Sequence, residues 1–146
     1  MRLIQTSALV LCLVTSAPVL ALAADAKADI EKAYATFNAA FNKQDAKAVA
    51  ANYVATAKVL PPTHEVVSGT AEIEKFFDGF FATGVTGHKL EIIDAGGDDK
   101  VVVGTAKWSA TGKEKDGKPA LFSGLAVHVF ERQADGSLKL KFHTFN

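Results

Sequence analysis

The chain has almost no cysteine: Cys12 is the single one among its 146 residues. One cysteine cannot form an intramolecular disulfide, so the fold must be held by its hydrophobic core. Arginine is nearly as scarce, with Arg2 and Arg132 only, and 16 Lys and Arg residues balance 16 Asp and Glu residues. A near-neutral chain with two guanidinium groups gives no electrostatic reason to expect nucleic acid or an anionic membrane as a partner.

The first 23 residues have the pattern of a secretory signal peptide. Arg2 precedes a run dominated by Leu, Val and Ala, and small residues occupy the −3 and −1 positions of a cleavage point after Ala23. The alternative is a membrane anchor, since the segment is nearly long enough to span a bilayer. Polar residues interrupt the run and the cleavage point follows it, which favours removal. We therefore expect a periplasmic or secreted protein whose mature form, residues 24–146, is one domain without a membrane contact.

The mature chain is predicted to form helices first and strands later, the order of an α+β domain. Apolar residues at three- and four-residue steps from Ile30 to Phe41 predict one helix, and the aromatic run from Ile73 to Phe81 predicts another. Asp45 is placed to cap a helix between them, which continues through Tyr53 and is followed by one brief strand. After these helices the period changes to two, which predicts strands over His88–Asp94, Val101–Thr111, Ala120–Arg132 and Leu138–Phe145.

Two Asp-Gly pairs predict the register of the last three strands. Asp116-Gly117 and Asp135-Gly136 stand between alternating runs, which is typical of two-residue hairpins whose residues pair symmetrically about the turn. One face is then expected to pack on the helices, and the other, half apolar, to meet a partner subunit. The helix-facing set is Ala106, Trp108, Leu125, Val127, Val129, Leu140, Phe142 and Thr144. The outer set is Thr105, Lys107, Phe122, Ala126, His128, Phe130, Lys139, Lys141 and His143.

Three helices, a Pro61 turn ending in Gly69 and a meander closing with His143-Thr144-Phe145-Asn146 resemble the NTF2-like superfamily. Within it, the chain is similar to the SnoaL-like, DUF4440 group of small exported bacterial proteins, and Asn42-Lys43-Gln44-Asp45 adds to this likeness. The resemblance implies a cone of three N-terminal helices packed on a curved antiparallel four-stranded meander plus one short strand. It also implies an apolar pocket and frequent dimers through the outer sheet face.

The resemblance does not choose a reaction, because the family includes isomerases, cyclases, dehydratases, epoxide hydrolases and non-catalytic binding domains. The general-base Asp of the ketosteroid isomerases aligns with Leu60 or Pro61, their oxyanion Tyr near Phe37, and their protonated Asp near Ala126. None of these side chains can perform those roles. The epoxide-hydrolase pattern of two Asp bridged by an Arg also fails, because Arg132 abuts a hairpin. We therefore expect no isomerase chemistry of the usual kind.

Histidines are the remaining candidates for chemistry. His64, in the proline turn, could reach the pocket mouth as a general base or could be a solvated loop residue, and Tyr53 is the other weak acid–base candidate. His128 and His143 are predicted cross-strand neighbours, which suits two metal ligands or an acid–base pair. Because a third ligand is lacking, we expect no metal and place the pair on a dimer face. The predicted dimer face is Phe122, His128, Phe130 and His143.

Aromatic residues predict either a ligand cavity or plain core. We expect an apolar pocket that binds a small hydrophobic or aromatic molecule in a homodimer, without a cofactor. One alternative is an isomerase, hydratase or cyclase acting on a small hydrophobic substrate. The other is a dimeric interaction module without a small-molecule ligand. The predicted pocket residues are Phe37, Tyr53, Phe80, Trp108, Leu125 and Phe142.

Overall fold

The structure is a computed structural model that describes residues 17–115 and 118–146. The predicted signal-peptide residues 1–16 and the turn residues 116–117 lie outside the described residues. Helix α1 begins within the predicted leader and continues past the expected cleavage point. In chain order the elements are α1 (Ala17–Asn42), α2 (Ala46–Ala50), β1 (Tyr53–Leu60), β2 (Val67–Ser68), α3 (Thr70–Ala82), β3 (Thr86–Gly97), β4 (Val101–Lys115), β5 (Lys118–Arg132) and β6 (Leu138–Phe145).

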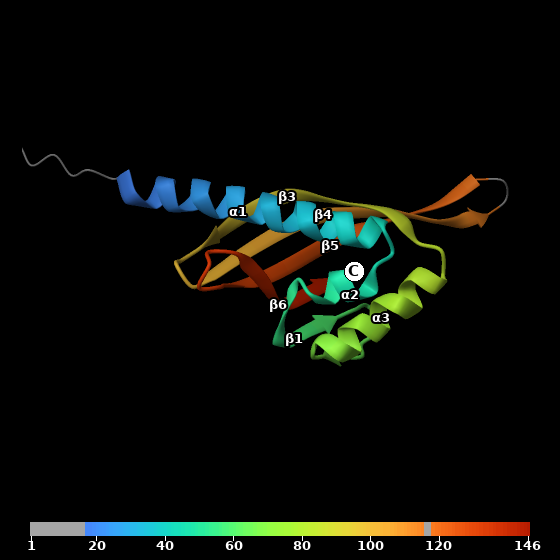
Figure 1. Cartoon of the computed structure of the whole chain (residues 1–146). Coiled ribbons are helices and arrows are strands. Elements are labelled where there is room, and N and C mark those ends of the chain that lie inside the picture. Colours follow the sequence, from blue (N-terminus) through green and yellow to red (C-terminus); the bar gives the residue numbers. More distant parts are fainter. Residues whose placement is uncertain (1–16, 116–117) are drawn as a thin grey trace, which may run out of the picture.

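The strands of the described residues form one curved sheet, and the helices pack on one of its faces (Figure 1). The strand order is β2-β1-β6-β5-β4-β3, with β1 parallel to β6 and the other neighbours antiparallel. Helix α1 crosses the meander β3 to β6, whereas α2 and α3 lie near β1 (Figure 1). The predicted α+β cone, with helices on a curved and mostly antiparallel sheet, is confirmed.

The second helix begins where the sequence predicts but is shorter. The Asp45 carboxylate accepts a hydrogen bond from the Ala48 N–H at 2.9 Å, which is the expected N-cap. Helix α2 ends after five residues, and Tyr53 starts β1 instead of continuing the helix. The Leu140 N–H donates to the Asn52 carbonyl at 2.8 Å and starts the parallel pairing with β6. Among the helices of the described residues, none is both long and apolar enough to cross a bilayer.

The hairpin between β4 and β5 contains a β-bulge that changes the predicted register. Next to the turn, Lys115 pairs with Lys118, as a two-residue turn requires. Between Thr111 and Glu114, however, β4 contains one residue more than the facing part of β5. Ala106 consequently pairs with Ala126 rather than with the residue after it. Because side chains alternate between faces, this slip of one residue reverses the faces predicted for β5.

The hairpin between β5 and β6 keeps the predicted pairing through a second bulge. His128 pairs with His143, as predicted, although the turn is one residue longer than two-residue geometry allows. Lys141 is the extra residue on β6, so Leu140 and His143 both face the helices and Phe142 between them faces outward. The predicted His128–His143 neighbourhood is therefore confirmed, but on the opposite side of the sheet.

The predicted dimer face is wrong for three of its four residues. His128 and Phe130 are 1% and 2% exposed, and His143 is also buried. These side chains face the helices, where the Tyr34 hydroxyl of α1 contacts His128. Phe122, the fourth, is half exposed and pairs with Ala110 toward the end of β5 that joins β4. The physical reason is the bulge in β4, which turns this face of β5 inward.

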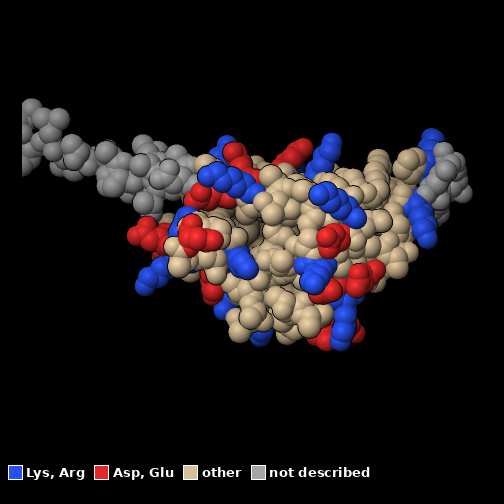
Figure 2. Space-filling model, in the orientation of Figure 1, with Lys and Arg blue, Asp and Glu red and all other residues tan. Residues whose placement is uncertain are grey.

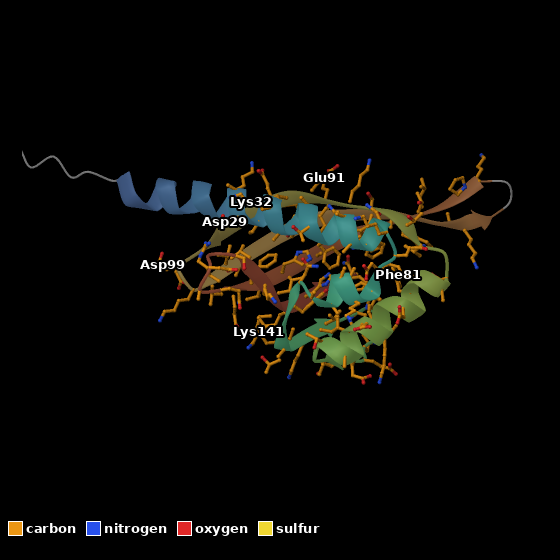
Figure 3. All side chains as sticks on the ribbon, viewed as in Figure 1. Asp29, Lys32, Phe81, Glu91, Asp99 and Lys141 are labelled. Atoms are coloured by element: carbon orange, nitrogen blue, oxygen red, sulfur yellow. The ribbon has the colours of Figure 1, made fainter. Side chains whose placement is uncertain are left out.

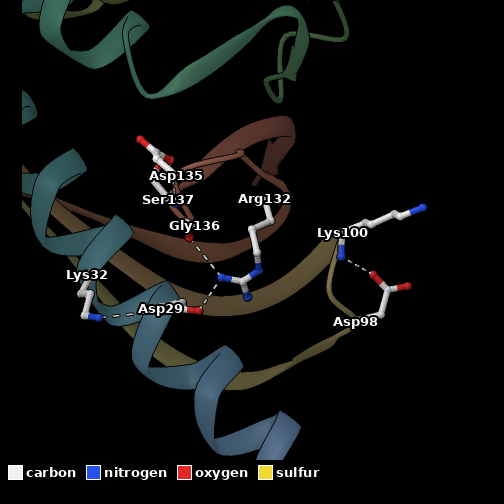
Figure 4. Close-up of polar contacts among 8 residues, drawn as sticks. All are labelled: Asp29, Lys32, Asp98, Lys100, Arg132, Asp135, Gly136 and Ser137. Carbon is white, nitrogen blue, oxygen red and sulfur yellow. Dashed lines mark hydrogen bonds and ion pairs between the residues drawn. The ribbon is translucent and has the colours of Figure 1, made fainter.

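Arg132 fastens the amino-terminal half of α1 to the β5–β6 hairpin. Its Nη1 donates to Asp29 Oδ2 at 2.7 Å and to the Gly136 carbonyl at 3.1 Å (Figure 4). Both charged side chains are about three-quarters buried, so the ion pair is shielded from solvent. Two wide clefts flank it, but they are open and lined by charges of both signs, so neither encloses a ligand. Arg132 is therefore a structural residue.

Candidate functional site

A partly open aromatic cavity lies between α1, α3 and the inner face of the sheet. The space open to the centre of a water molecule is about 30 Å³, whereas the whole void with its mouth is about 410 Å³. One or two waters therefore fit without any movement, and a larger molecule fits only when the mouth opens. The cavity is lined by Phe37, Phe41, Phe76, Phe77, Phe80, His88, Leu90, Trp108, Ala110, Ala126, His143 and Phe145.

The aromatic wall is built mainly from helix periodicity. Phe37 and Phe41 lie one helical turn apart on α1, and Phe77 of α3 meets both rings edge-on, at centroid distances of 6.0 and 6.1 Å. Phe76 and Phe80 of α3 are half buried at the mouth and stack on each other at 6.2 Å. On the sheet side of the wall, Leu90, Trp108 and Phe145 are also partly exposed, so solvent borders the cavity from both α3 and the sheet.

The structure places three of the six predicted pocket residues in the cavity wall. Phe37, Phe80 and Trp108 line it. Tyr53 is buried behind the wall, where its hydroxyl contacts His143 rather than the cavity. Leu125 and Phe142 were predicted to line the pocket, but they lie on the outer sheet face, 53% and 42% exposed. The same two bulges that bury the histidines expose these side chains.

Three imidazoles are buried on the inner face, and each uses its Nδ1 atom. The Tyr53 hydroxyl lies 2.7 Å from His143 Nδ1, and the Tyr34 hydroxyl lies 2.8 Å from His128 Nδ1. His88 Nδ1 lies 2.7 Å from Asn38 Oδ1. His88 and His143 line the cavity, and the ring of His128 packs behind that of His143 at a centroid distance of 4.5 Å.

His88, rather than His64, is the additional histidine of the site. His64, the predicted general base, is exposed in the proline turn at φ +66° and does not line the cavity. His88 was not singled out, although it begins an alternating run with Leu90 and Ile92 on one face of β3. That alternation is the signal that could have found it, because it predicts that His88 points to the same side as its apolar neighbours.

Burial keeps all of these groups uncharged at neutral pH. It lowers the pKa of His88 to about 4 and that of His128 to about 3, where the charge of His88 adds a smaller effect. Burial also lowers the pKa of His143, with contributions from His128 and His88. The pKa values of the Tyr34 and Tyr53 hydroxyls are raised by burial, so neither ionises. The cavity therefore offers neutral hydrogen-bonding atoms.

Charged side chains surround the site without entering it. Lys32, Glu91, Asp99 and Lys141 lie at the periphery of the molecule, away from the aromatic side chains between the helices and the sheet (Figure 3). Positive and negative residues are mixed over the described part of the face in Figure 2, which shows no large patch of one sign. Within the described ranges, no group of three or more His, Cys, Asp or Glu residues is arranged to hold a metal ion.

Solved structures with the same arrangement of elements define its class, the NTF2-like fold. A ketosteroid isomerase-like protein from Erwinia carotovora atroseptica is 21% identical, with a TM-score of 0.70, over 81% of this chain and 92% of that one. A protein described as a calcium/calmodulin dependent protein kinase II association domain, from Xanthomonas campestris, is 22% identical, with a TM-score of 0.64, over 80% and 84%. An NTF2-like protein with a cystatin-like fold from Novosphingobium aromaticivorans is 14% identical, with a TM-score of 0.71, over 84% and 81%. At these identities the likeness establishes the fold alone.

Residues 34–140 match the family model of the SnoaL-like domain, so the chain belongs to the SnoaL-like family. Among curated proteins, none matches the sequence. The similar structures are described as an isomerase-like protein in one case and as an association domain in another, so the family assignment alone leaves the function open.

Proposed function

We propose that this protein binds a small, mostly apolar aromatic molecule in the cavity between α1, α3 and the sheet. The observation that carries the proposal is the cavity wall, in which every side chain is aromatic, aliphatic or a neutral imidazole. Apolar surface dominates such a wall, and burial of a ligand there removes that surface from water. A two-ring ligand that buries about 250 Å² gains at most about 6 kcal/mol, which corresponds to a Kd on the order of tens of micromolar.

The experiment uses the single tryptophan as the reporter. Trp108 lines the cavity, and its indole Nε1–H donates to the Asn146 carbonyl at 3.1 Å, so it gives one well-separated signal in a nitrogen-15 spectrum. Naphthalene is expected to shift this signal saturably. Ala126→Leu fills the cavity and is expected to abolish the shift. The matched control Val127→Leu enlarges the neighbouring residue on the outer face and is expected to leave it intact. No shift in the unaltered protein contradicts the proposal.

A second proposal concerns the outer face of the sheet, which we infer to be a homodimer interface. What supports it is a set of apolar side chains that remain exposed in the single chain, namely Val103, Leu125, Val127 and Phe142. Sedimentation at micromolar concentration should give twice the mass of one chain. A monomer that persists up to the highest concentrations tested overturns this proposal and leaves the cavity proposal intact.

We also propose that the protein is exported and processed after Ala23, and that it belongs with the small exported proteins of the DUF4440 group. The support is the sequence of residues 1–23 alone. Mass determination of the protein from a periplasmic extract should give a chain that begins at Ala24. An uncleaved chain in the membrane fraction supports an anchor instead.

The enzyme alternative rests on one observation: His88 and His143 are titratable groups in the cavity wall. Neither of the earlier acid–base candidates, His64 and Tyr53, lines the cavity. Any acid–base chemistry would therefore use His88 and His143, and turnover of a bound probe, rather than binding alone, would distinguish this alternative.

A further inference from the structure

The two imidazoles in the cavity wall are held in different protonation patterns. Each uses Nδ1 for a contact inside the protein, His143 with Tyr53 and His88 with Asn38. Nε2 is left as the ring nitrogen that a ligand can reach. Because a neutral imidazole carries one proton, the Nδ1 partner decides whether Nε2 is a donor or an acceptor.

His143 presents a donor. The Tyr53 side chain is almost completely buried, and within the described residues His143 Nδ1 is the one partner of its hydroxyl. If Nδ1–H donated to the Tyr53 oxygen, the phenolic proton would have no protein acceptor in a site that burial closes to solvent, which costs about 1–3 kcal/mol. The Tyr53 O–H therefore donates to Nδ1. The proton of the His143 ring must then be on Nε2.

His88 presents an acceptor. Its Nδ1 lies 2.7 Å from Asn38 Oδ1, a carbonyl oxygen that can only accept, so the His88 proton is on Nδ1. Asn42 fixes the backbone of His88 from the same helix face: its Oδ1 accepts from the His88 N–H at 2.7 Å and its Nδ2 donates to the His88 carbonyl at 3.0 Å. Ring stacking on Phe41, at a centroid distance of 4.4 Å, holds the plane of the imidazole. His88 Nε2 therefore carries a lone pair.

Both Nε2 atoms are available to a ligand. Among residues 17–115 and 118–146 neither atom has a hydrogen-bond partner. Neither atom is fully closed to solvent. Both rings line the cavity and pack against Phe37, with ring centroids 5.6 and 6.0 Å from the Phe37 centroid. One donor and one acceptor thus stand in an otherwise apolar wall.

We propose that the cavity selects a neutral, ring-shaped molecule with a carbonyl-type acceptor for His143 Nε2–H and a separate hydroxyl or N–H donor for His88 Nε2. This inference rests on the proposed function and adds the chemical class of the ligand. A phenolic ketone is the simplest member of that class. Each matched hydrogen bond satisfies a buried polar atom that an apolar ligand would leave unpaired.

Carboxylates are excluded by the same wall. No Lys or Arg of the described residues lines the cavity, and the imidazoles are neutral at pH 7. An ionised carboxylate would lose its hydration on entering this site and would find no cation to offset the desolvation free energy. The proposed ligand class therefore contains neutral molecules only.

Four single-ring probes of similar size separate these contributions, with Trp108 as the reporter. 4′-Hydroxyacetophenone has both groups, 4′-methoxyacetophenone lacks the donor, 4-ethylphenol lacks the carbonyl, and 4-hydroxybenzoate is charged. We expect the first to bind roughly three- to tenfold more tightly than the second or the third, the contribution of one hydrogen bond, and the fourth not to bind. Equal affinity for the three neutral probes overturns this proposal but leaves the proposed function standing. Failure of naphthalene and all four probes to bind overturns both.

Two tyrosine variants test the protonation pattern with a matched control. Tyr53→Phe removes the donor to His143 Nδ1, so the proton is no longer confined to Nε2. Because the proton is then shared between Nδ1 and Nε2, we expect binding of 4′-methoxyacetophenone to weaken about twofold while binding of 4-ethylphenol stays unchanged. Tyr34→Phe removes the equivalent bond to His128, which does not line this cavity, and should change neither. Retained naphthalene binding shows that each variant is folded. Identical effects of the two variants on both probes contradict the proposal.

Discussion

The two faces of strand β5 reverse the pattern that hydropathy suggests. The inner face buries His128, a polar side chain, whereas Leu125 and Val127 on the outer face are exposed. The buried imidazole is tolerated because the Tyr34 hydroxyl satisfies its Nδ1 and because it remains neutral. The exposed aliphatic residues have no such local explanation, and a partner subunit would provide one. The comparison teaches that burial on this sheet follows register and hydrogen bonding, not the polarity of single residues.

The largest expected effect is that acid destabilises the fold through the buried histidines of the inner face. The folded-state pKa values of His88 and His128 lie below the unfolded value of 6.5, so the unfolded chain binds more protons between them and stability falls as pH falls. Between pH 7.5 and pH 4.5 these two residues should lower the free energy of unfolding by about 5 kcal/mol, and His143 should add to this loss. Urea unfolding at both pH values measures the difference.

The control for this prediction is a pair of variants. His88→Phe should remove about half of the loss that the two histidines cause, while replacement of the exposed His64 by Ala should leave it unchanged. Equal stability of the unaltered protein at the two pH values would show that the imidazoles are not buried.

Truncation of one phenylalanine on each face of the sheet compares the two faces directly. Phe130 is buried and Phe142 is 42% exposed. Phe130→Ala should lower the free energy of unfolding by about 3–5 kcal/mol, because it removes core contacts and leaves a cavity. Phe142→Ala should lower it by less than about 1 kcal/mol when measured in the monomer. A larger loss of stability for Phe142→Ala than for Phe130→Ala would mean that Phe142 faces the helices, as a register without bulges predicts.

The tyrosine hydroxyls should have intermediate effects. Tyr34→Phe and Tyr53→Phe each leave a buried Nδ1 without its hydrogen-bond partner, which should cost about 1–3 kcal/mol of unfolding free energy. Thermal unfolding at pH 7 measures both. A change within error for either variant means that the corresponding hydrogen bond does not form.

The smallest effect on monomer stability belongs to the outer face. Val127→Lys should change the unfolding free energy by no more than about 0.5 kcal/mol, but it should dissociate the proposed dimer. Sedimentation measures the assembly and urea unfolding measures the stability. If Val127→Lys unfolds the chain, then the outer face is packed against part of the same chain.

Local patterns in the sequence predict most of the fold. The apolar spacing from Ile30 to Phe41 and the Asp45 cap depend on neighbouring residues, and the structure contains the corresponding helices. The two Asp-Gly pairs stand where β4 gives way to β5 and β5 to β6. The bulges near Gly112 and at Lys141 are different. They arise because strands must twist and curve to cover the helices, and a single extra residue leaves no periodic signal. One such residue suffices to exchange the inner and outer faces.

The candidate site was only partly predictable for the same reason. Phe37 and Phe80 could be predicted because helix periodicity places them on a buried face. Trp108 could be predicted because the bulge leaves its side of β4 unchanged. His143 was placed beside His128 correctly but on the wrong side. His88 was missed because its role depends on the Asn38 amide, which is 50 residues away and is brought close only by tertiary packing.

The most direct test of the account is a nitrogen-15 spectrum of the histidine rings at pH 7, recorded with and without 4′-hydroxyacetophenone. We predict a proton on Nδ1 of His88 and on Nε2 of His143, and a change at both Nε2 atoms when the probe binds. His64, which is exposed and outside the cavity, should not change. The same proton position on His88 and His143, or a bound probe that alters neither ring, would contradict the account.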